Sequence, residues 1–328
     1  MKRKGLLLFV LTSCCALASL ASCEKKIKIG ILQPVEHDAL TAARNGFIEG
    51  LKEKGFEEGK NIKIIYQNAN GESANQTSFA KTLTTKCDLT LGIGTGATQS
   101  LQAAHVNSGS TKPLLFTAVT DAVDAKLVES NERPGGFITG TSDVNPVTDQ
   151  IDLIKTCIPD VDKIGIIYTQ SEVNSKVQAD LAKDQAESNG IQVVIETCTD
   201  SADVASVANH LCATEGLDAI FIPTDNNIAA HMSAVSIPAN QNHILLVGGE
   251  EGIVKNGAHI TLSVNYTELG KKCGFMAAEV LNGKNPGEMP VQSMTVNECS
   301  FVMSSSNLAA AGITLPAEVL SRFTDLDS

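Results

Sequence analysis

Two hydrophobic periods alternate along most of the chain. Runs of consecutive apolar residues, such as residues 27–32 and 89–93, are typical of parallel strands covered on both faces. Between them lie longer stretches, such as residues 39–54 and 266–281, in which apolar residues recur at helical spacing. This alternation indicates an α/β chain whose parallel sheets are doubly wound.

The predicted elements extend from residue 27 to residue 281. Strands are expected at 27–32, 62–67, 89–93, 114–117, 164–168, 192–196, 219–222, 243–247 and 258–262. Helices are expected at 39–54, 76–86, 146–156, 174–189, 201–215 and 266–281. Gly283 and Pro286 follow the last of these helices, as residues that end helices commonly do.

The chain also resembles itself. The fragment KIGIL at Lys28 returns as KIGII at Lys163, and DLTLGIGTGA at Asp88 has a counterpart, DAIFIPTDNN, at Asp218. PLLFTAVTD and HILLVGGEE form a third pair in the same order. Three matches in one order predict two half-chains of the same topology, each large enough to form a domain. Two such lobes side by side leave a cleft between the carboxyl ends of their strands.

Polar residues gather where the predicted strands end. The first of these loops carries Glu36 and His37 immediately before a helix. Ligands of open α/β sheets bind at this edge, where the following helices also offer free amide donors. The other strand-end loops, at 95–98, 117–121, 169–172, 224–227 and 249–251, share small hydroxyl residues, glycines and one or two acids. This composition predicts a cleft for a small zwitterionic ligand.

The N-terminus has the pattern of an export signal. Three basic residues precede an apolar segment, residues 5–20, that is too short and too interrupted to be a convincing membrane span. Small residues then precede Cys23, which resembles the lipobox of bacterial lipoproteins. That resemblance implies a signal peptide at residues 1–22 and a diacylglycerol on Cys23, which would anchor the protein to the periplasmic or cell-surface side of a bacterial membrane. An ordinary secretory signal with a free Cys23 is the alternative, and it too implies export.

Net charge and cysteine spacing indicate which partners and cofactors the chain is expected to lack. The net charge of −12 becomes −15 without the three basic residues of the signal. Such an acidic chain argues against nucleic acid as a partner and against any membrane contact other than the lipid anchor. No CxxC motif or His/Cys cluster occurs at metal-ligand spacing, so neither a metal nor another cofactor is expected. Outside the signal and Cys23, six cysteines remain, and the sequence does not decide whether they form disulfides, in any of fifteen pairings, or are buried free thiols. They are Cys87, Cys157, Cys198, Cys212, Cys273 and Cys299.

Longer motifs resemble a known family. The chain is similar to the ABC-transporter substrate-binding lipoproteins of the tryptophan/tyrosine-binding type in IGILQPVEHDALTAARNGFIEGL, EGKNIKIIYQNANG, PLLFTAVTDAVDAKLV, PGGFITGTSD, SEVNS, DAIFIPTDN and LGKKCGFMAAEVLNGKNP. These motifs cover nearly the whole mature chain in order. The resemblance implies a type I periplasmic-binding-protein fold, with two Rossmann-like lobes and a three-segment hinge. It also implies a monomer that binds an amino acid, often an aromatic one, and delivers it to an ABC permease and its ATPase.

The lobe boundaries follow from the same resemblance. It places residues 27–143 and about 266–288 in the first lobe, and residues 144–265 and about 289–328 in the second, with the ligand cleft between them. The hinge crossings are expected near 142–146, 263–266 and 289–297.

An amino-acid ligand needs donors for its carboxylate and a carboxylate for its ammonium. We expect hydroxyls and helix amides of the first lobe to bind the carboxylate, and Asp225 of the second lobe to hold the ammonium, with Glu250 and Glu36 as other candidates. A ligand held from both lobes would favour the closed state. The expected ligand-binding residues are Glu36, Thr95, Gly96, Ala97, Thr117, Ala118, Thr120, Asn174, Ser175, Asp225, Asn226 and Glu250.

Several of these residues have a simpler structural interpretation. Asp225, Thr95 and Thr117 are equally well placed to cap the helices that follow them. A structural role is also the first expectation for His37. The chain has no tryptophan, so the aromatic candidates for stacking on a ligand are Phe116, Tyr168 and Tyr266.

The motifs favour binding over catalysis. The chain has no GxSxG elbow and no GxxxxGK[ST] loop, and its histidines are scattered. No catalytic residue is therefore expected. Two alternatives remain open. One is an exported enzyme acting on a small polar metabolite, with Glu36, His37 and Asp121 as acid and base. The other is a ligand-sensing ectodomain that docks on a receptor.

Overall fold

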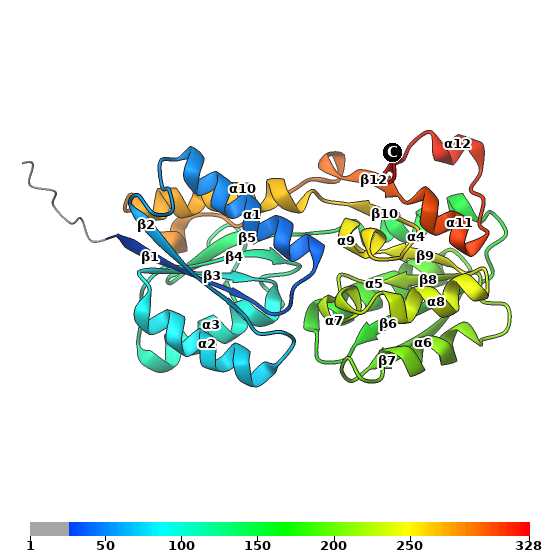
Figure 1. The fold of residues 1–328 in the computed structure, drawn as a ribbon, viewed down its shortest axis with the longest axis horizontal. Coiled ribbons are helices and arrows are strands. Elements are labelled where there is room, and N and C mark those ends of the chain that lie inside the picture. The colour runs from blue at the N-terminus through cyan, green and yellow to red at the C-terminus, as the bar shows by residue number, and fades with distance from the viewer. Residues whose placement is uncertain (1–25) are drawn as a thin grey trace, which may run out of the picture.

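Two lobes lie end to end along the long axis of the molecule (Figure 1). The computed structural model describes residues 26–328, so the signal peptide and Cys23 lie outside the described residues. The first lobe contains a sheet with strand order β11-β5-β4-β3-β1-β2, and the second a sheet with order β13-β12-β10-β9-β8-β6-β7. All pairs of the first sheet are parallel, whereas β10 and β12 of the second are antiparallel.

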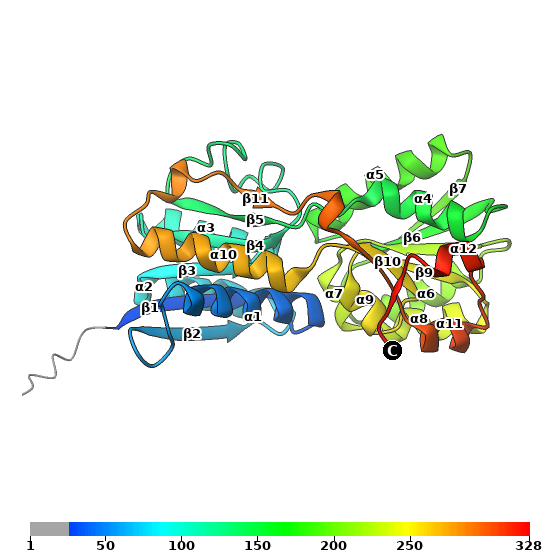
Figure 2. The same ribbon diagram turned by 90° about the horizontal axis from the view of Figure 1, so that it is seen from above.

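The first lobe is built mainly from the N-terminal part of the chain. Its elements are β1 (Ile27–Gln33), α1 (Asp38–Glu53), β2 (Ile62–Asn68), α2 (Ser73–Lys86), β3 (Leu89–Ile93), α3 (Thr95–Ser108), β4 (Leu114–Val119) and β5 (Ile138–Ser142). The chain returns to this lobe with α10 (Tyr266–Leu281), η1 (Pro286–Glu288) and β11 (Gln292–Ser293). Figure 2 shows α10 alongside α1, and β11 alongside β5 at the edge of the sheet.

The second lobe repeats the strand–helix plan and adds a C-terminal extension. Its first part is α4 (Val147–Cys157), β6 (Lys163–Thr169), α5 (Val173–Ser188), β7 (Gln192–Cys198), α6 (Val204–Cys212), β8 (Ala219–Ile222), α7 (Asn226–Ala230), α8 (Ser233–Gln241), β9 (Leu245–Gly248), α9 (Glu251–Lys255) and β10 (Ile260–Ser263). Its second part is β12 (Ser300–Met303), α11 (Ser305–Ala311), α12 (Ala317–Leu320) and β13 (Thr324–Asp325), and η2 (Val296–Glu298) precedes it.

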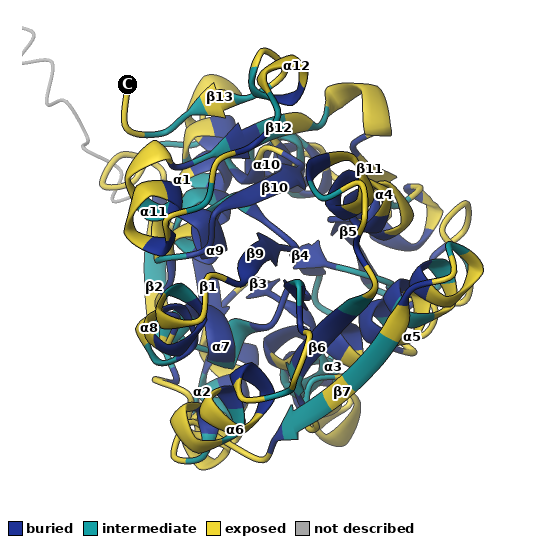
Figure 3. Cartoon of the chain, turned by 90° about the vertical axis from the view of Figure 1, so that its right-hand side faces the viewer, coloured by how far each residue is buried: buried dark blue, intermediate teal, exposed yellow. Residues whose placement is uncertain are grey.

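Central strands are buried on both faces, as their continuous apolar sequences predict. Every residue of β3, β4, β8 and β9 is buried, whereas the edge strands β2 and β7 are only partly covered. Seen along the long axis in Figure 3, buried strands lie inside and the exposed faces of helices lie outside. This confirms the predicted α/β class with doubly wound parallel sheets.

The internal sequence repeat corresponds to a structural repeat. Asp88 and Asp218 occupy equivalent positions at the start of β3 and β8, each beside the first strand of its lobe. The Asp88 carboxylate accepts a hydrogen bond from the backbone N–H of Lys28 at 2.8 Å, and Asp218 accepts one from Lys163 at 3.0 Å. The recurring Lys–Ile–Gly and Asp motifs therefore fix the same strand register twice.

Three segments cross between the lobes. They run from Ser142 to Val147, from Ser263 to Tyr266, and from Ser293 to Ser300. The last crossing comes later than the boundary expected near residue 289, because Gln292–Ser293 pair with Thr141 and Ser142 in the first sheet. Residues up to Ser293 thus belong with the first lobe.

Helix α3 and strand β5 of the first lobe escaped prediction, as did the short elements η1 and β11. Residues 95–98, expected as a loop, form the first turn of α3. This helix is rich in hydroxyl and amide residues, so its apolar face consists only of Ala97, Leu101 and Ala104. Strand β5 has the sequence ITGTS, which lacks a strand-like apolar run. Gly140 lets this strand lie against β4, since a Cβ there would come within 2.1 Å of the Phe116 carbonyl oxygen.

The six cysteines of the described chain are free thiols. Cys87, Cys157, Cys198, Cys212 and Cys273 are buried, and Cys299 is partly exposed. Of the two possibilities left open by the sequence, the structure has the buried thiols, which pack as small hydrophobic groups.

Candidate functional site

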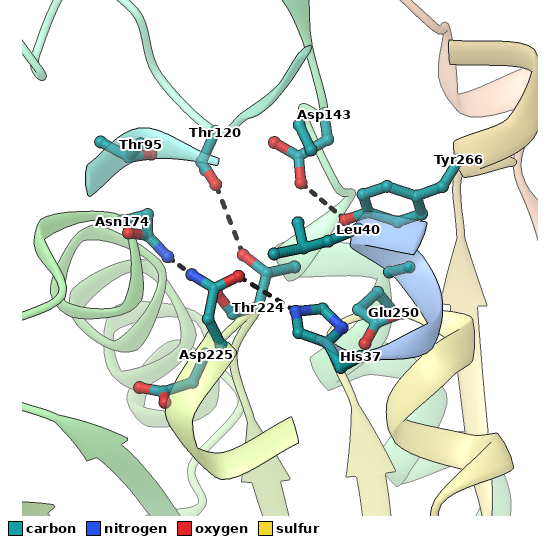
Figure 4. Close-up of a pocket in the computed structure, with 13 residues that line it drawn as sticks. His37, Leu40, Thr95, Thr120, Asp143, Asn174, Thr224, Asp225, Glu250 and Tyr266 are labelled. Atoms are coloured by element: carbon teal, nitrogen blue, oxygen red, sulfur yellow. Dashed lines mark hydrogen bonds between the residues drawn. The ribbon is translucent and has the colours of Figure 1, made fainter. Parts of the chain in front are cut away.

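A pocket lies between the lobes, where strands of both sheets end at their carboxyl sides (Figure 4). It contains about 310 Å³ of space that protein atoms do not fill, part of it open to solvent. The pocket is lined by His37, Ala39, Leu40, Thr95, Ala118, Thr120, Asp143, Asn174, Thr224, Asp225, Asn226, Glu250 and Tyr266.

The first lobe contributes a wall of small and hydroxyl residues. Thr95 is the first residue of α3, and Gly94 before it adopts φ 81°, a left-handed conformation that favours glycine. Ala118 lies where the register of β4 shifts, with φ 55°, which is rare for a residue with a side chain. Such backbone strain is frequent at ligand sites. The first-turn amides of α3 have no partner within the helix and are available to an anion.

The second lobe contributes helix caps. Asp225 is the N-cap of α7, and its Oδ1 accepts hydrogen bonds from the Ile228 N–H at 2.9 Å and the Thr169 hydroxyl at 2.9 Å. Its Oδ2 accepts one from the Thr169 N–H at 2.6 Å. Glu250 caps α9 in the same way, accepting from the N–H groups of Gly252 and Ile253. Both carboxylates are thus committed to backbone donors of their own lobe.

The hinge contributes a third wall. Asp143 follows β5 in the first crossing, and its Oδ2 accepts a hydrogen bond from the Tyr266 hydroxyl at 2.6 Å. Figure 4 shows this pair at one side of the pocket. Asn145 donates to the Tyr266 oxygen at 3.2 Å and accepts from the Val264 N–H at 3.4 Å, which ties the first crossing to the second. The other carboxylate oxygen of Asp143 is buried and has no hydrogen-bond partner among the described residues.

The pocket is acidic, and its carboxyl groups are buried. Burial raises the pKa of Asp143 to about 6 and that of Glu250 to about 8, and it also raises the pKa of Asp225. Burial lowers the pKa of His37, which is therefore neutral near pH 7. No lysine or arginine is among the described residues that line the pocket. A ligand that carries a positive charge would offset this imbalance.

The two lobes touch each other around the pocket. The Thr120 and Thr224 hydroxyls are 3.4 Å apart across the cleft (Figure 4). The His37 ring nitrogen Nε2 is 3.1 Å from Asn226 Oδ1. The Asn226 amide nitrogen donates to Glu172, so its oxygen faces His37 and the histidine carries its proton on Nε2. These contacts describe a closed cleft.

The structure brings together part of the predicted residue set. The pocket is lined by Thr95, Ala118, Thr120, Asn174, Asp225, Asn226 and Glu250, which come from both lobes. The expectation that Asp225 holds the ammonium does not agree with its contacts, which are those of a helix cap. Of the aromatic candidates, Tyr266 lines the pocket, whereas Phe116 is fully buried in a core cluster and Tyr168 packs against another.

Five predicted residues lie outside the pocket lining. Glu36 bonds to Thr41, Arg44, Tyr66 and Asn68 on the outer side of the first lobe, with about half of its side chain exposed. The Thr117 hydroxyl accepts a hydrogen bond from Thr141 within the sheet. The remaining three are Gly96, which is exposed on α3, Ala97, which packs in a core cluster, and Ser175, which is fully buried on α5.

Sequence reasoning missed Asp143. Its signal was the same as for the other strand-end residues, but β5 itself was not predicted, so the loop after it was assigned to the hinge alone. Thr224 lay in a loop already singled out yet was not chosen, and His37 was expected to be structural. In the structure His37 both lines the pocket and bonds to the opposite lobe.

Two further observations on the described residues concern metal sites and membrane spans. They contain no group of three metal-binding side chains that could hold an ion. No helix in this part of the chain has the length and apolar character needed to cross a membrane. The pocket itself offers hydroxyls, amides and carboxylates, which suit recognition of a small polar ligand.

Comparison with known proteins agrees with this geometry. Residues 28–326 match a family model described as ABC transporter substrate binding protein. The chain is 41% identical over 288 residues to the tyrosine-binding protein of Clostridioides difficile, a match that covers 88% of this chain and 81% of that protein. A distant solute-binding protein of Bacillus halodurans with bound myo-inositol, 14% identical, shares the fold with a TM-score of 0.61 over 86% of this chain and 96% of that one.

Two solved structures separate the ligand-bound from the ligand-free arrangement. The Streptococcus pneumoniae ABC domain in complex with L-Trp is 31% identical and has a TM-score of 0.85. The ligand-free, open structure of a Clostridium difficile substrate-binding protein with adhesive properties is 37% identical, yet its TM-score is 0.68. Both matches cover 92% of this chain and 99% of the other. The less identical but ligand-bound structure fits better, which agrees with the contacts that close the cleft here.

Two similar lobes, three crossings and a pocket at their strand ends are the features of the type I periplasmic-binding-protein fold. The family model spans nearly all described residues. The chain therefore belongs to the ABC transporter substrate-binding proteins, a family that binds its substrate and does not turn it over.

Proposed function

We propose that this chain captures an aromatic amino acid, tyrosine or tryptophan, outside the cytoplasm and delivers it to an ABC permease. The observation that carries the proposal is the closed interlobe pocket, which is lined by buried carboxylates and helix N-termini but by no lysine or arginine of the described chain. An amino acid supplies the missing positive charge with its ammonium. Its carboxylate is matched by hydroxyls and free helix amides.

The apolar part of the pocket supports an aromatic side chain. Ala39, Leu40 and Ala118 line the first-lobe side, and Tyr266 adds an aromatic ring beside them. Tyrosine and tryptophan are also the ligands named for the C. difficile relative and the S. pneumoniae structure. An aromatic ring buried among these groups would contribute most of the hydrophobic binding energy.

The contacts that we propose for the polar end come from both lobes. Thr95 and Thr120, with the first-turn amides of α3 around Gly96 and Ala97, are suited to the ligand carboxylate. Asn174, Thr224 and Asn226 approach from the second lobe. Donors on two lobes make the ligand bind the closed state more tightly than the open one, and this difference in affinity drives closure.

Anchoring and delivery complete the proposal. The lipobox-like sequence before Cys23 supports a lipid anchor on the outer side of the membrane. A monomer with both lobe rims exposed could then present its closed form to the permease and the ATPase behind it.

Ligand screening tests the function. We expect the melting temperature of the purified mature chain to rise with L-tyrosine or L-tryptophan, following RT ln(1 + [L]/Kd). The ligand should be recovered unchanged after incubation. If no aromatic amino acid shifts the melting temperature while a sugar or a nucleoside does, the assignment of the ligand class is wrong.

A further inference from the structure

We propose that Asp143, in the first hinge crossing, is the group that holds the ammonium of the ligand, and that Tyr266 is its positioning residue. This inference rests on the proposed function, because it assigns one pole of an amino acid to one side chain. It moves the ammonium from the second lobe, where the sequence placed it, to the hinge.

Asp143 has a carboxylate oxygen without a hydrogen-bond partner among the described residues. Asp143 is 2% exposed and lines the pocket. Its Oδ2 is bonded to the Tyr266 hydroxyl at 2.6 Å, but its Oδ1 is buried without a hydrogen-bond partner among the described residues. A buried polar atom without a partner is costly and is rare in native proteins. A ligand ammonium has three N–H donors and can supply the missing charge-assisted hydrogen bond.

The other two buried carboxylates of the pocket already have hydrogen-bond partners. Both oxygens of Asp225 accept hydrogen bonds, from Thr169 and from the Ile228 N–H. Both oxygens of Glu250 accept from the first turn of its own helix, at Gly252 and Ile253. Donors of the second lobe thus satisfy the oxygens of both side chains without a ligand. Asp143 accepts one hydrogen bond within 3.5 Å, from the Tyr266 hydroxyl, and the Thr120 hydroxyl lies near enough to lower its pKa without pairing its Oδ1.

The backbone and neighbours of Asp143 hold it at the hinge side of the pocket. The Asp143 N–H donates to the Val119 carbonyl at 3.1 Å, which fixes its backbone to the end of β4. Tyr266 begins α10, and Asn145 links its hydroxyl to Val264 of the second crossing. The ammonium would therefore bind to a framework made by two of the three crossings. Closure then adds Asn174, Thr224 and Asn226.

The inference predicts which part of the ligand is indispensable. An amine that lacks the carboxylate keeps the contact with Asp143, whereas a deaminated acid loses it. The parent protein should therefore bind L-tyrosine best, tyramine more weakly, and 3-(4-hydroxyphenyl)propionate most weakly. For a tryptophan binder the matching probes are L-tryptophan, tryptamine and indole-3-propionate.

The test is isothermal titration calorimetry of the parent and Asp143→Asn with these three probes. We expect the substitution to lower the affinity for the amino acid and the amine at least about 30-fold, as loss of a buried charge partner does. The affinity for the deaminated acid should stay within about threefold. The preference for amino acid over deaminated acid thus collapses, which a purely structural defect would not cause because it weakens all three probes together. Tyr266→Phe should weaken the same two probes about three- to tenfold.

Control variants make the result decisive. Asp121→Asn removes one charge from the loop after β4, but Asp121 bonds to the backbone of Val123 and Asp124 and does not line the pocket. It should leave all three affinities unchanged. If Asp225→Asn or Glu250→Gln abolishes the preference and Asp143→Asn does not, the ammonium site is wrong while the amino-acid function stands. A parent that binds neither the amino acids nor the amines overturns both proposals.

Discussion

The carboxylates of the pocket differ in what their oxygens bind, and this difference separates structural from ligand-facing roles. Asp225 and Glu250 are both buried, yet each closes the first turn of a short helix. Asp143 lies equally deep but keeps one oxygen free. From the sequence alone, all three acids at strand ends are equal candidates for ligand binding. Helix capping and ligand binding both favour acidic residues at these positions.

Burial of these acids has a measurable effect on stability. The pKa of Glu250 is raised to about 8, and that of Glu172 is also raised to about 8 by burial and by the charge of Asp225. An unfolded glutamate titrates near pH 4.3, so between pH 6.5 and 8 the native state holds protons that the unfolded chain has lost. The resulting stabilisation is complete at low pH and is lost as pH rises through the native pKa. We therefore expect the ligand-free protein to become less stable from pH 6.5 to 8.

Urea unfolding at several pH values measures this slope. The upper limit is about 1.4 kcal/mol per pH unit for each proton. The buried histidines His105 and His259, whose pKa values burial lowers to about 4, still bind protons in the unfolded chain near pH 6.5 and oppose the slope there, so the loss of stability is steepest above about pH 7. Glu250→Gln should reduce the slope, with Glu172 responsible for the remainder. A free energy of unfolding that rises over this range would contradict the expectation.

At the scale of elements, the packing of α10 on α1 holds the returning chain in the first lobe. Each helix carries two glycines four residues apart, at Gly46 and Gly50 on α1 and at Gly270 and Gly274 on α10. A Cβ on Gly270 would come within 2.0 Å of the Ala43 carbonyl oxygen, and one on Gly46 within 2.0 Å of the Thr267 carbonyl oxygen. Glycine therefore lets the two backbones approach, and no small rotamer change could make room for a larger residue.

We expect Gly270→Ala to lower the free energy of unfolding by about 1–3 kcal/mol, the usual cost of forcing extra volume into a packed interface. Gly96→Ala is the matched control, because Gly96 lies in the first turn of α3 and its nearest foreign atom is a flexible glutamine end at 3.6 Å. There alanine should be neutral or stabilise by up to about 1 kcal/mol through its higher helix propensity. Denaturant titrations of both variants measure this difference in the free energy of unfolding. An equal loss of stability in the two variants would contradict the prediction.

At the scale of the whole molecule, the closed cleft has a cost without a ligand. It buries the unpaired oxygen of Asp143 and leaves the Nδ1 atom of His37 buried without a partner among the described residues. The direct contacts between the lobes include one bond of 3.1 Å and one of 3.4 Å. Such contacts contribute about 1 kcal/mol each, which does not outweigh burial of unpaired polar groups. The ligand would supply the missing partners.

We therefore expect small-angle X-ray scattering to show a larger radius of gyration for the ligand-free protein than for the ligand-bound one. Saturating L-tyrosine or L-tryptophan should shift the scattering curve to the one calculated from the closed arrangement. A sugar that does not bind serves as the control. Identical curves with and without a bound ligand would mean that closure does not depend on it.

The sequence by itself determined the fold class, because burial of a strand on both faces requires consecutive apolar residues and an amphipathic helix requires its own period. It also predicted the repeated topology, because local motifs such as those at Lys28 and Lys163 recur in both halves of the chain. The sequence pattern did not predict strand β5 or helix α3. Strand β5 depends on the fit of Gly140 against Phe116, which no local pattern shows. Helix α3 has a weak apolar face, so its formation depends on packing against neighbouring elements.

Only the tertiary structure decided which polar residues face the ligand. Seven of the predicted residues line the pocket, while Glu36 turns outward to Arg44 and Tyr66, which are brought beside it by α1 and β2. Asp143 gained its role from Tyr266, more than a hundred residues away along the chain. A side chain's bonding partners are set by packing between distant segments, and no local pattern records whether an oxygen is already satisfied.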